Sequence, residues 1–512
     1  MKISSMVPPY AVIAVLACCC LCAKAEIRLP HMLSDEAVLQ RDRPIHLWGW
    51  SSPNARISAH FHKQTAVGTA DDRGRWSLYL QPEPAGGPYV LTLSGDGGTR
   101  TLNDILVGDV WLASGQSNME FPLQGFGVGT PLKNQAEEIA NANHPHLRLL
   151  RLEHKSSDFP LNDSSASWTT CTPETAKDFS AVAYFFGREI SEREKVPIGL
   201  IDTTWGGTPA DSWVSLDTLG SDPRLLPAFA SRASFANQQA DLDATVAAEK
   251  REDDAAKAAG KPAPSHPWHP YETSWLPGGL YNGMIAPLTQ MTIKGFLWYQ
   301  GETNSSPERA PFYHSLFSAL IGDWRQHFAQ GSLPFLFVQI SSFTSPGENW
   351  GLVREQQRRT LDIADTAMVV TLDVGERDNV HPADKQTVGA RLALAARATV
   401  YGEKVSFSGP AFREATPLEQ ADGTKAMQVW FDDAEGLSFH GKPASGFELA
   451  GSDHKFVPAD SRIQDGAVLV STPTVPNPIY VRYGWMSAVP DSLYNAAGLP
   501  ASTFTSEPTP LR

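Results

Sequence analysis

The chain of 512 residues has room for about two to four domains of ordinary size. With 42% hydrophobic and 19% charged residues it can bury large cores, which excludes an intrinsically disordered protein. Its 56 acidic and 42 basic residues give a net charge of −14, which argues against nucleic acid or an anionic membrane surface as the main partner.

The N-terminus has the pattern of a secretory signal peptide. After Met1-Lys2, an apolar stretch from Tyr10 to Cys22 is too short to span a bilayer, and Ala23-Lys24-Ala25 fits a small-x-small cleavage site. We therefore predict that residues 1–25 are removed and that the mature chain is secreted or periplasmic. The alternative is a bacterial lipoprotein box ending at Cys18, which would tether the protein through that cysteine.

Cysteine usage fits export without disulfides. Four of the five cysteines lie in the segment predicted to be removed, which leaves only Cys171. A single thiol closes no internal bridge, so stability must come from packing. No later apolar run reaches the roughly 20 residues that a membrane span needs, so we predict none.

Two regions with the sequence pattern of β-strands flank the middle of the chain. From Glu26, short alternating runs such as Ile45–Trp50 are separated by turn clusters rich in Asp and Gly. The same pattern of short strand-like runs occurs again from Glu403, for example in Lys425–Phe431. We predict β-sandwich-like domains over residues 26–105 and 403–512.

Residues 106–402 predict an α/β domain, because apolar strands alternate with longer amphipathic segments. The expected strands are Asp109–Ala113, Leu147–Leu152, Ile198–Thr203, Lys294–Tyr299, Phe335–Ile340 and Met368–Leu372. The expected helices are Phe179–Arg193, Pro311–Phe328, Val353–Ile363 and Ala383–Tyr401. In such parallel sheets, chemistry collects at the carboxyl ends of the strands.

An insertion over about residues 220–278 interrupts this alternation. Ser231–Lys261 is rich in alanine and charged residues and predicts a solvent-facing helix, followed by a Pro/His/Trp-rich loop over 262–270. His266 and His269 lie among prolines without a third ligand nearby, so we interpret them as part of the loop and predict no metal site.

Ser117 follows the first expected strand of this domain. In Gly115-Gln116-Ser117, the strand runs into a glycine and then a serine at the edge of the sheet, near backbone N–H groups that can receive a developing oxyanion. The alternative is a helix N-cap, because Ser117 and Glu120 also have the spacing of a capping box.

Asp378 and His381 follow the last expected strand. Pro382 suits the first position of the next helix, which would place His381 just before that helix, where an imidazole stays neutral and can accept a proton. Asp378, three residues earlier, could accept the other ring N–H and fix the tautomer. The alternative is a loop aspartate and a surface histidine.

Two further strand ends offer hydrogen-bond donors. Gln300 and Asn304 lie in a polar run after the strand Lys294–Tyr299 and could donate to an oxyanion, and Glu302 between them could bind substrate or serve as the acid beside His381. The pair Gly206-Gly207 lets a backbone N–H approach a ligand closely. Each segment taken singly also fits a turn.

Three segments in this order resemble the SGNH hydrolase superfamily, and within it the sialate O-acetylesterase-like carbohydrate esterases: Gly115–Met119, Trp298–Asn304 and Asp378–Pro382. Asp202–Pro209 and Tyr281–Leu288 support the resemblance. It implies a flavodoxin-like core, a parallel sheet between helices, flanked by the two β domains. It also implies an enzyme that hydrolyses acetyl esters on sugars without a metal or other cofactor.

The resemblance also implies roles for individual residues. Ser117 would be the nucleophile, His381 the general base and Asp378 its partner, with Glu302 as an alternative or additional acid. The implied oxyanion hole consists of backbone N–H groups and one side-chain amide. The backbone donors are Ser117, Gly206 and Gly207, and the side-chain donor is either Gln300 or Asn304. The last choice stays open because the wider superfamily has Gly-x-Asn-Asp where this chain has Gly301–Asn304. Substrate binding is expected from Gln116, Trp205 and Glu302.

We therefore predict a carbohydrate O-acetylesterase whose partner is an acetylated carbohydrate. One alternative keeps the enzyme class and moves the substrate to acetylated xylan or xyloglucan. Another, of a different class, is a carbohydrate-binding protein on an inactive hydrolase scaffold; the presence of Ser117, Asp378 and His381 together argues against it.

Overall fold

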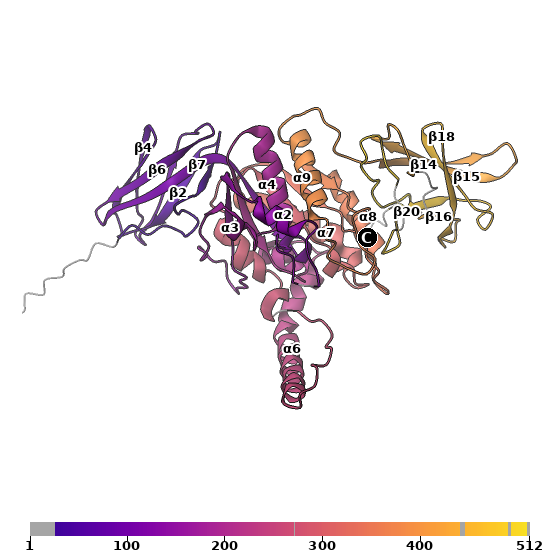
Figure 1. The fold of residues 1–512 in the computed structure, drawn as a ribbon, viewed down its shortest axis with the longest axis horizontal. Coiled ribbons are helices and arrows are strands. Elements are labelled where there is room, and N and C mark those ends of the chain that lie inside the picture. The colour runs from indigo at the N-terminus through magenta and orange to yellow at the C-terminus, as the bar shows by residue number, and fades with distance from the viewer. Residues whose placement is uncertain (1–25, 128, 271, 441–445, 490–492, 509–512) are drawn as a thin grey trace, which may run out of the picture.

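The computed structural model describes residues 26–127, 129–270, 272–440, 446–489 and 493–508. The predicted signal peptide and Cys18 lie outside these residues. Figure 1 shows a β region, an α/β region and a second β region in a row, with one long helix projecting from the middle. Within the described ranges, no helix combines the length and the apolar character that crossing a membrane would require.

The N-terminal β region consists of two sheets whose strands are antiparallel except for β1, which pairs in parallel with β7. Its strands are β1 (Val38–Gln40), β2 (Ile45–Trp50), β3 (Arg56–Phe61), β4 (Gln64–Thr69), β5 (Arg75–Leu80) and β6 (Gly86–Gly95). β2 pairs with β5, whereas β3, β4 and β6 form a sheet with the first half of the long strand β7 (Gly98–Gly115). Because β7 continues into the central sheet, one strand joins the two regions.

The central sheet has the order β13-β12-β11-β7-β10-β8-β9. Its other strands are β8 (His144–Arg151), β9 (Thr169–Cys171), β10 (Ile198–Thr204), β11 (Gly295–Tyr299), β12 (Phe335–Val338) and β13 (Thr366–Val369). All neighbours are parallel except β8 and β9. The six expected strands are all present, with β7 at the centre; the three-residue β9 is an addition that its polar sequence did not signal.

Helices cover both faces of this sheet. Trp111 of β7 packs edge-on against Phe186 of α4 (Ala181–Glu194), which lies beside α9 (Lys385–Thr399). On the other face, Phe296 and Trp298 of β11 pack against Trp324 of α7 (Tyr313–Phe328), the neighbour of α8 (Trp350–Arg359). The predicted fold class, a parallel sheet between helices with β regions on both sides, is confirmed.

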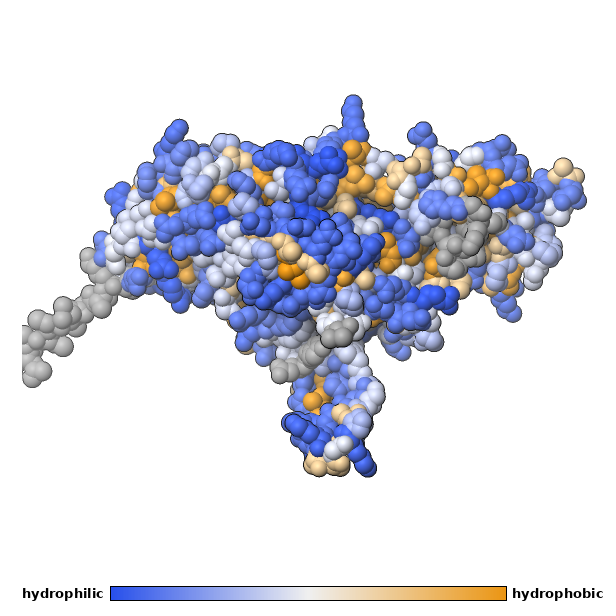
Figure 2. All heavy atoms as spheres, in the orientation of Figure 1, coloured by the Kyte–Doolittle hydropathy of each residue, from blue (hydrophilic) through white to orange (hydrophobic). Residues whose placement is uncertain are grey.

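The remaining helices are short, except one. They are α1 (Ser117–Glu120), α2 (Gln135–Ala140), α3 (Pro173–Ala176) and α5 (Leu216–Ser221). The exception is α6 (Leu226–Ala258), which occupies the segment expected to be a solvent-facing helix and has no buried residue along its 33 residues. It projects away from the sheet, and its visible surface is mostly hydrophilic (Figures 1 and 2).

The C-terminal β region has two antiparallel sheets of four strands, β14-β15-β19-β18 and β17-β16-β20-β21. The strands are β14 (Ala411–Glu419), β15 (Lys425–Asp432), β16 (Phe447–Ala450), β17 (Val457–Pro458), β18 (Asp460–Gln464), β19 (Ala467–Ser471), β20 (Tyr480–Tyr483) and β21 (Phe504–Thr505). Aromatic rings fill the space between the sheets, where Phe504 contacts Phe412, Phe431 and Phe447.

Candidate active site

Ser117 lies at the carboxyl end of the central strand. The backbone there makes a turn that only glycine permits: Gly115 has a φ of +136°, and a Cβ at this position would lie 2.1 Å from the carbonyl oxygen of Tyr299. Ser117 is the first residue of α1, and the residue before it, Gln116, provides no side-chain cap. The capping-box alternative is therefore wrong, and the serine hydroxyl is available to the pocket.

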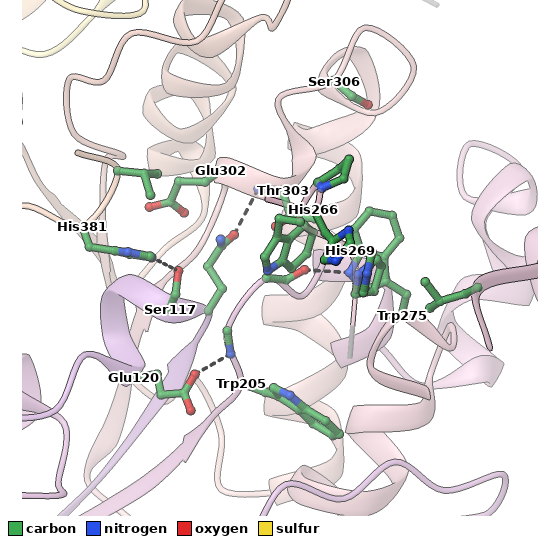
Figure 3. A pocket seen from close by; sticks show the side chains of 18 of the residues that line it. Ser117, Glu120, Trp205, His266, His269, Trp275, Glu302, Thr303, Ser306 and His381 are labelled. Atoms are coloured by element: carbon green, nitrogen blue, oxygen red, sulfur yellow. Dashed lines mark hydrogen bonds between the residues drawn. The ribbon is translucent and has the colours of Figure 1, made fainter. Parts of the chain in front are cut away.

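His381 reaches Ser117 from the loop between β13 and α9. Its Nε2 lies 2.8 Å from Ser117 Oγ (Figure 3). The side chain of Asn379 holds the loop, since its Oδ1 accepts the His381 N–H at 3.0 Å and its Nδ2 donates to the His381 carbonyl at 2.8 Å. The structure thus brings together the two side chains that the sequence placed 264 positions apart.

The helix after His381 starts later than we expected. α9 begins at Lys385, capped by Asp384, whose Oδ1 accepts the Thr387 N–H at 3.1 Å. Pro382 is therefore not the first helical residue, and His381 does not stand directly before the helix. Aspartate is a stronger N-cap than His381, the residue that would cap a helix starting at Pro382, which favours the later start.

The pKa of His381 falls to about 4, for a reason other than a helix terminus. Burial disfavours the cationic ring and is the largest cause, the positive charge of Lys385 adds to it, and Glu120 opposes both. The imidazole is therefore neutral near pH 7, with Nε2 available to accept a proton from a hydroxyl.

A buried chain of polar contacts lies behind the serine. Lys385 Nζ donates to Asn118 Oδ1 at 2.5 Å, and Asn118 Nδ2 donates to Glu302 Oε1 at 2.6 Å and to the Val380 carbonyl at 3.0 Å. Burial lowers the pKa of Lys385 to about 7 and raises the pKa of Glu302. Asn118 thereby links the helix of Ser117 to the loops of Glu302 and His381.

The two candidate acids lie in different surroundings. Asp378 is exposed and, in the described part of the chain, makes no hydrogen bond to His381. Glu302 is buried and lines the pocket, and its Oε2 has no hydrogen-bond partner among the described residues. Figure 3 shows its carboxylate beside the His381 ring, above Ser117. The sequence left open which of these carboxylates is the acid beside His381, and the two differ in burial and in their position relative to its ring.

Gly206 lies directly against the serine, but its N–H is occupied. A Cβ built on Gly206 would lie 3.3 Å from Ser117 Cβ and 2.9 Å from Glu120 Oε2, so a side chain here would push against both residues. The Gly206 N–H donates to Glu120 Oε2 at 2.5 Å, and Glu120 Oε1 pairs with His154 Nε2 at 2.9 Å. The His154 ring stacks on Trp205, with centroids 4.6 Å apart.

Gln300 and Asn304 face each other instead of the pocket. Asn304 Oδ1 accepts from Gln300 Nε2 at 2.6 Å and from the Ala210 N–H at 2.9 Å, and the Tyr313 hydroxyl donates to Gln300 Oε1 at 3.0 Å. Both side chains are buried and neither lines the cavity. Gln300 Nε2 is engaged within the protein, and these bonds hold the loop that carries Glu302.

Gln116, expected to bind substrate, lines the cavity and also holds this loop. Its Oε1 accepts the backbone N–H of Thr303 at 3.1 Å and, more weakly, that of Gly301 at 3.4 Å. Trp205 and Glu302, the other expected substrate-binding residues, line the same cavity.

The cavity has a volume of about 2010 Å³. Ser117 and His381 line one part of it, and residues of α6 and of the loop after α6 line another. Among the described residues, no group of three histidine, cysteine, aspartate or glutamate side chains is arranged to hold a metal ion.

The sequence analysis missed several residues that surround the serine: Asn118, Glu120, His154 and Lys385. Lys385 had a usable signal. It stands on the apolar stripe of its helix, three and seven residues before the buried Val388 and Leu392, and a lysine on such a stripe needs a buried partner.

Comparison with known proteins fits this geometry. A family described as carbohydrate esterase, sialic acid-specific acetylesterase, matches residues 107–246 and 266–398, which is more than half of the chain. The chain belongs to this family. It is therefore a carbohydrate esterase, an enzyme that hydrolyses acetyl esters.

Relatives of the chain agree. The sialate O-acetylesterase of Homo sapiens is 32% identical over 429 residues, which cover 75% of this chain and 73% of the human protein. The sialate O-acetylesterase of Mus musculus is 30% identical over 418 residues, covering 71% and 72%. The crystal structure of a carbohydrate acetylesterase from Xanthomonas citri superposes with a TM-score of 0.79 at 36% identity, covering 94% of this chain and 99% of that one.

Proposed function

We propose that this esterase removes acetyl groups from sugar hydroxyls through an acyl-enzyme intermediate, with Ser117 as nucleophile and His381 as general base. The observation that supports these roles is the 2.8 Å contact between His381 Nε2 and Ser117 Oγ, at a pocket built by strand ends of a parallel sheet. A serine beside a neutral imidazole is the arrangement that activates a hydroxyl for attack on a carbonyl.

The reaction proceeds in two steps. His381 Nε2 accepts the Ser117 hydroxyl proton while Oγ attacks the acetyl carbonyl. His381 then gives that proton to the sugar oxygen, and the bond between the acetyl carbon and the sugar oxygen breaks. In the second step His381 takes a proton from water, and the resulting hydroxide attacks the acetyl-serine. The proton returns from His381 to Ser117 Oγ as the bond between Oγ and the acetyl carbon breaks, and acetic acid leaves and ionises to acetate in solvent.

The backbone N–H groups of Ser117 and Gly207 are the donors we propose for the oxyanion. Neither donates a hydrogen bond to another described residue, whereas the Gly206 N–H is bound to Glu120. Gly206 joins them only if Glu120 moves away. Each such donor accounts for roughly 3–4 kcal/mol of the barrier.

We assign the acid to Glu302 in preference to Asp378, and replacement of each carboxylate by its amide tests this assignment. Glu302→Gln is expected to lower kcat/KM by at least about 10²-fold, because the imidazolium formed during the reaction loses the buried carboxylate that lies beside its ring in Figure 3. Asp378→Asn, the matched control, is expected to stay within about threefold because Asp378 is exposed. A larger loss in Asp378→Asn than in Glu302→Gln would return the role to Asp378.

The pH dependence of kcat/KM should show the lowered pKa of His381. Activity requires the neutral imidazole, so it falls as the pH drops through the pKa of about 4, and not through the ordinary 6.5. Lys385→Met removes a positive charge that holds this pKa down and is expected to move the acid limb to higher pH. Lys133→Met, an exposed lysine paired with Asp384, is the control and should leave the limb in place. An acid limb near 6.5 in the unmodified chain would contradict the proposed burial effect.

The proposed substrate is an O-acetylated sugar, met after export as a secreted or periplasmic enzyme. The test is acetate release from O-acetylated N-acetylneuraminic acid, acetylated xylan and acetylated xyloglucan by the unmodified chain and by Ser117→Ala. Release from none of these substrates, or equal release by both proteins, would overturn the proposal.

A further inference from the structure

The cavity is much larger than the acetyl group needs. Its volume of about 2010 Å³ exceeds the roughly 300–1,000 Å³ of most small-ligand pockets, and an acetyl group fills only a small fraction of it. The rest of the space is available to the alcohol half of the ester. One part of the cavity wall comes from the insertion and not from the strand ends. This part belongs to Leu226–Pro270, here called the α6 hairpin.

The α6 hairpin folds back on itself through two histidine–carboxylate contacts. His266 Nε2 lies 3.0 Å from Asp253 Oδ1, and His269 Nε2 lies 2.7 Å from Glu249 Oε2. Since α6 buries none of its residues, the helix adds little to a hydrophobic core. The helix instead supports the loop after it through His266 and His269, and Trp268 lies between these two histidines in the sequence.

Trp268 lies against the glycine loop beside Ser117. A Cβ built on Gly207 would lie 2.3 Å from Trp268 Cζ2 and 2.7 Å from Cη2, so this edge of the indole ring packs closely on the glycine, yet 59% of Trp268 stays exposed. Trp275 lies beside it, with ring centroids 6.5 Å apart, and donates its Nε1–H to the Gly207 carbonyl at 2.7 Å. The guanidinium of Arg309 stands 4.5 Å from the centre of the Trp275 ring.

We propose that Trp268 and Trp275 form a subsite for the pyranose ring of the alcohol half of the ester, and that the α6 hairpin holds Trp268 in place. The proposal rests on the proposed function. An exposed indole beside a reactive site suits the C–H face of a pyranose, while charged groups that line the same cavity suit its hydroxyl edge. These groups are Asp243, Lys250, Glu308 and Arg309.

The test compares two acetyl esters that differ in the alcohol. Methyl tri-O-acetyl-β-D-xylopyranoside has a pyranose ring, and ethyl acetate has none. Trp268→Ala is expected to lower kcat/KM for the pyranoside by about 10- to 50-fold, mostly through KM, and to change ethyl acetate hydrolysis less than about twofold. Trp268→Phe should restore part of the loss. His269→Ala should give a loss of the same kind, because it releases the loop from Glu249.

Tyr79→Ala is the matched control, because this aromatic residue of β5 is also 59% exposed but lies in the N-terminal sheet. Equal losses on both esters after Trp268→Ala would indicate a general structural role and overturn the subsite, as would no loss on either. If the unmodified chain hydrolyses neither ester, the proposed function fails; calorimetric titration of the pyranoside into Ser117→Ala and into Ser117→Ala/Trp268→Ala then decides the subsite. Equal heats of binding in the two proteins would overturn it.

Discussion

Replacing Ser117 by alanine is expected to lower kcat/KM for acetyl-sugar hydrolysis by at least about 10³-fold and by as much as about 10⁶-fold. Without Oγ no acyl-enzyme forms, and His381 loses the hydroxyl that lies 2.8 Å from its Nε2. The fold should persist, because alanine suits the first turn of a helix and the hydroxyl makes no capping contact. The measurement is the initial rate of acetate release on the best acetylated sugar.

Ser114→Ala is the control for this substitution. Ser114 lies three residues earlier, near the end of β7, and its buried hydroxyl has no hydrogen-bond partner among the described residues. Its removal should leave kcat/KM within about twofold, since no bond is lost. If Ser117→Ala keeps a tenth of the parent activity or more while Ser114→Ala behaves as expected, Ser117 is not the nucleophile.

The central sheet was predictable because its strands are buried on both faces and read as continuous apolar runs. What the sequence did not signal was the extent of β7. The expected strand, Asp109–Ala113, was placed by the apolar run Val110–Ala113, yet the strand runs from Gly98 to Gly115. Its first half has one solvated face and pairs with β6 instead, so the pattern changes within one strand.

The two central side chains were predictable for a different reason. Strand ends of a parallel sheet meet at one edge, so Ser117 and His381 were expected together without knowledge of the loops. The same argument could not decide whether Asp378 contacts His381, because spacing along a loop does not fix the direction of a side chain. Here Asn379 takes the hydrogen bonds that shape the turn, and Asp378 lies at the surface.

The polar run after β11 shows why donors are hard to assign from sequence. Gln300 and Asn304 were expected to serve the substrate, but a buried loop must first satisfy its own polar groups. Gln300 and the Asn304 Oδ1 atom are used in contacts to each other, to Ala210 and to Tyr313, and the residues of this run that line the cavity are Glu302 and Thr303.

Replacing Arg354 by methionine is expected to lower the free energy of unfolding by about 3–5 kcal/mol. This fully buried side chain of α8 donates five hydrogen bonds to backbone carbonyls: those of Ile340, Ser341, Gly484, Met486 and Ser487. Burial without a carboxylate partner lowers its pKa to about 9, so it remains charged at pH 7. Methionine fills the space but leaves these carbonyls unsatisfied.

The loss should be larger than for any surface arginine, because the five carbonyls belong to two parts of the chain: the end of β12 and the segment between β20 and β21. Arg413→Met, at an exposed position of β14, is the control and should change stability by less than about 0.5 kcal/mol. Arg354→Lys should recover part of the difference, since an ammonium has three donors where the guanidinium uses five. Urea unfolding followed by tryptophan fluorescence measures all three variants. Equal midpoints for Arg354→Met and Arg413→Met would show that the buried guanidinium does not join these two segments energetically.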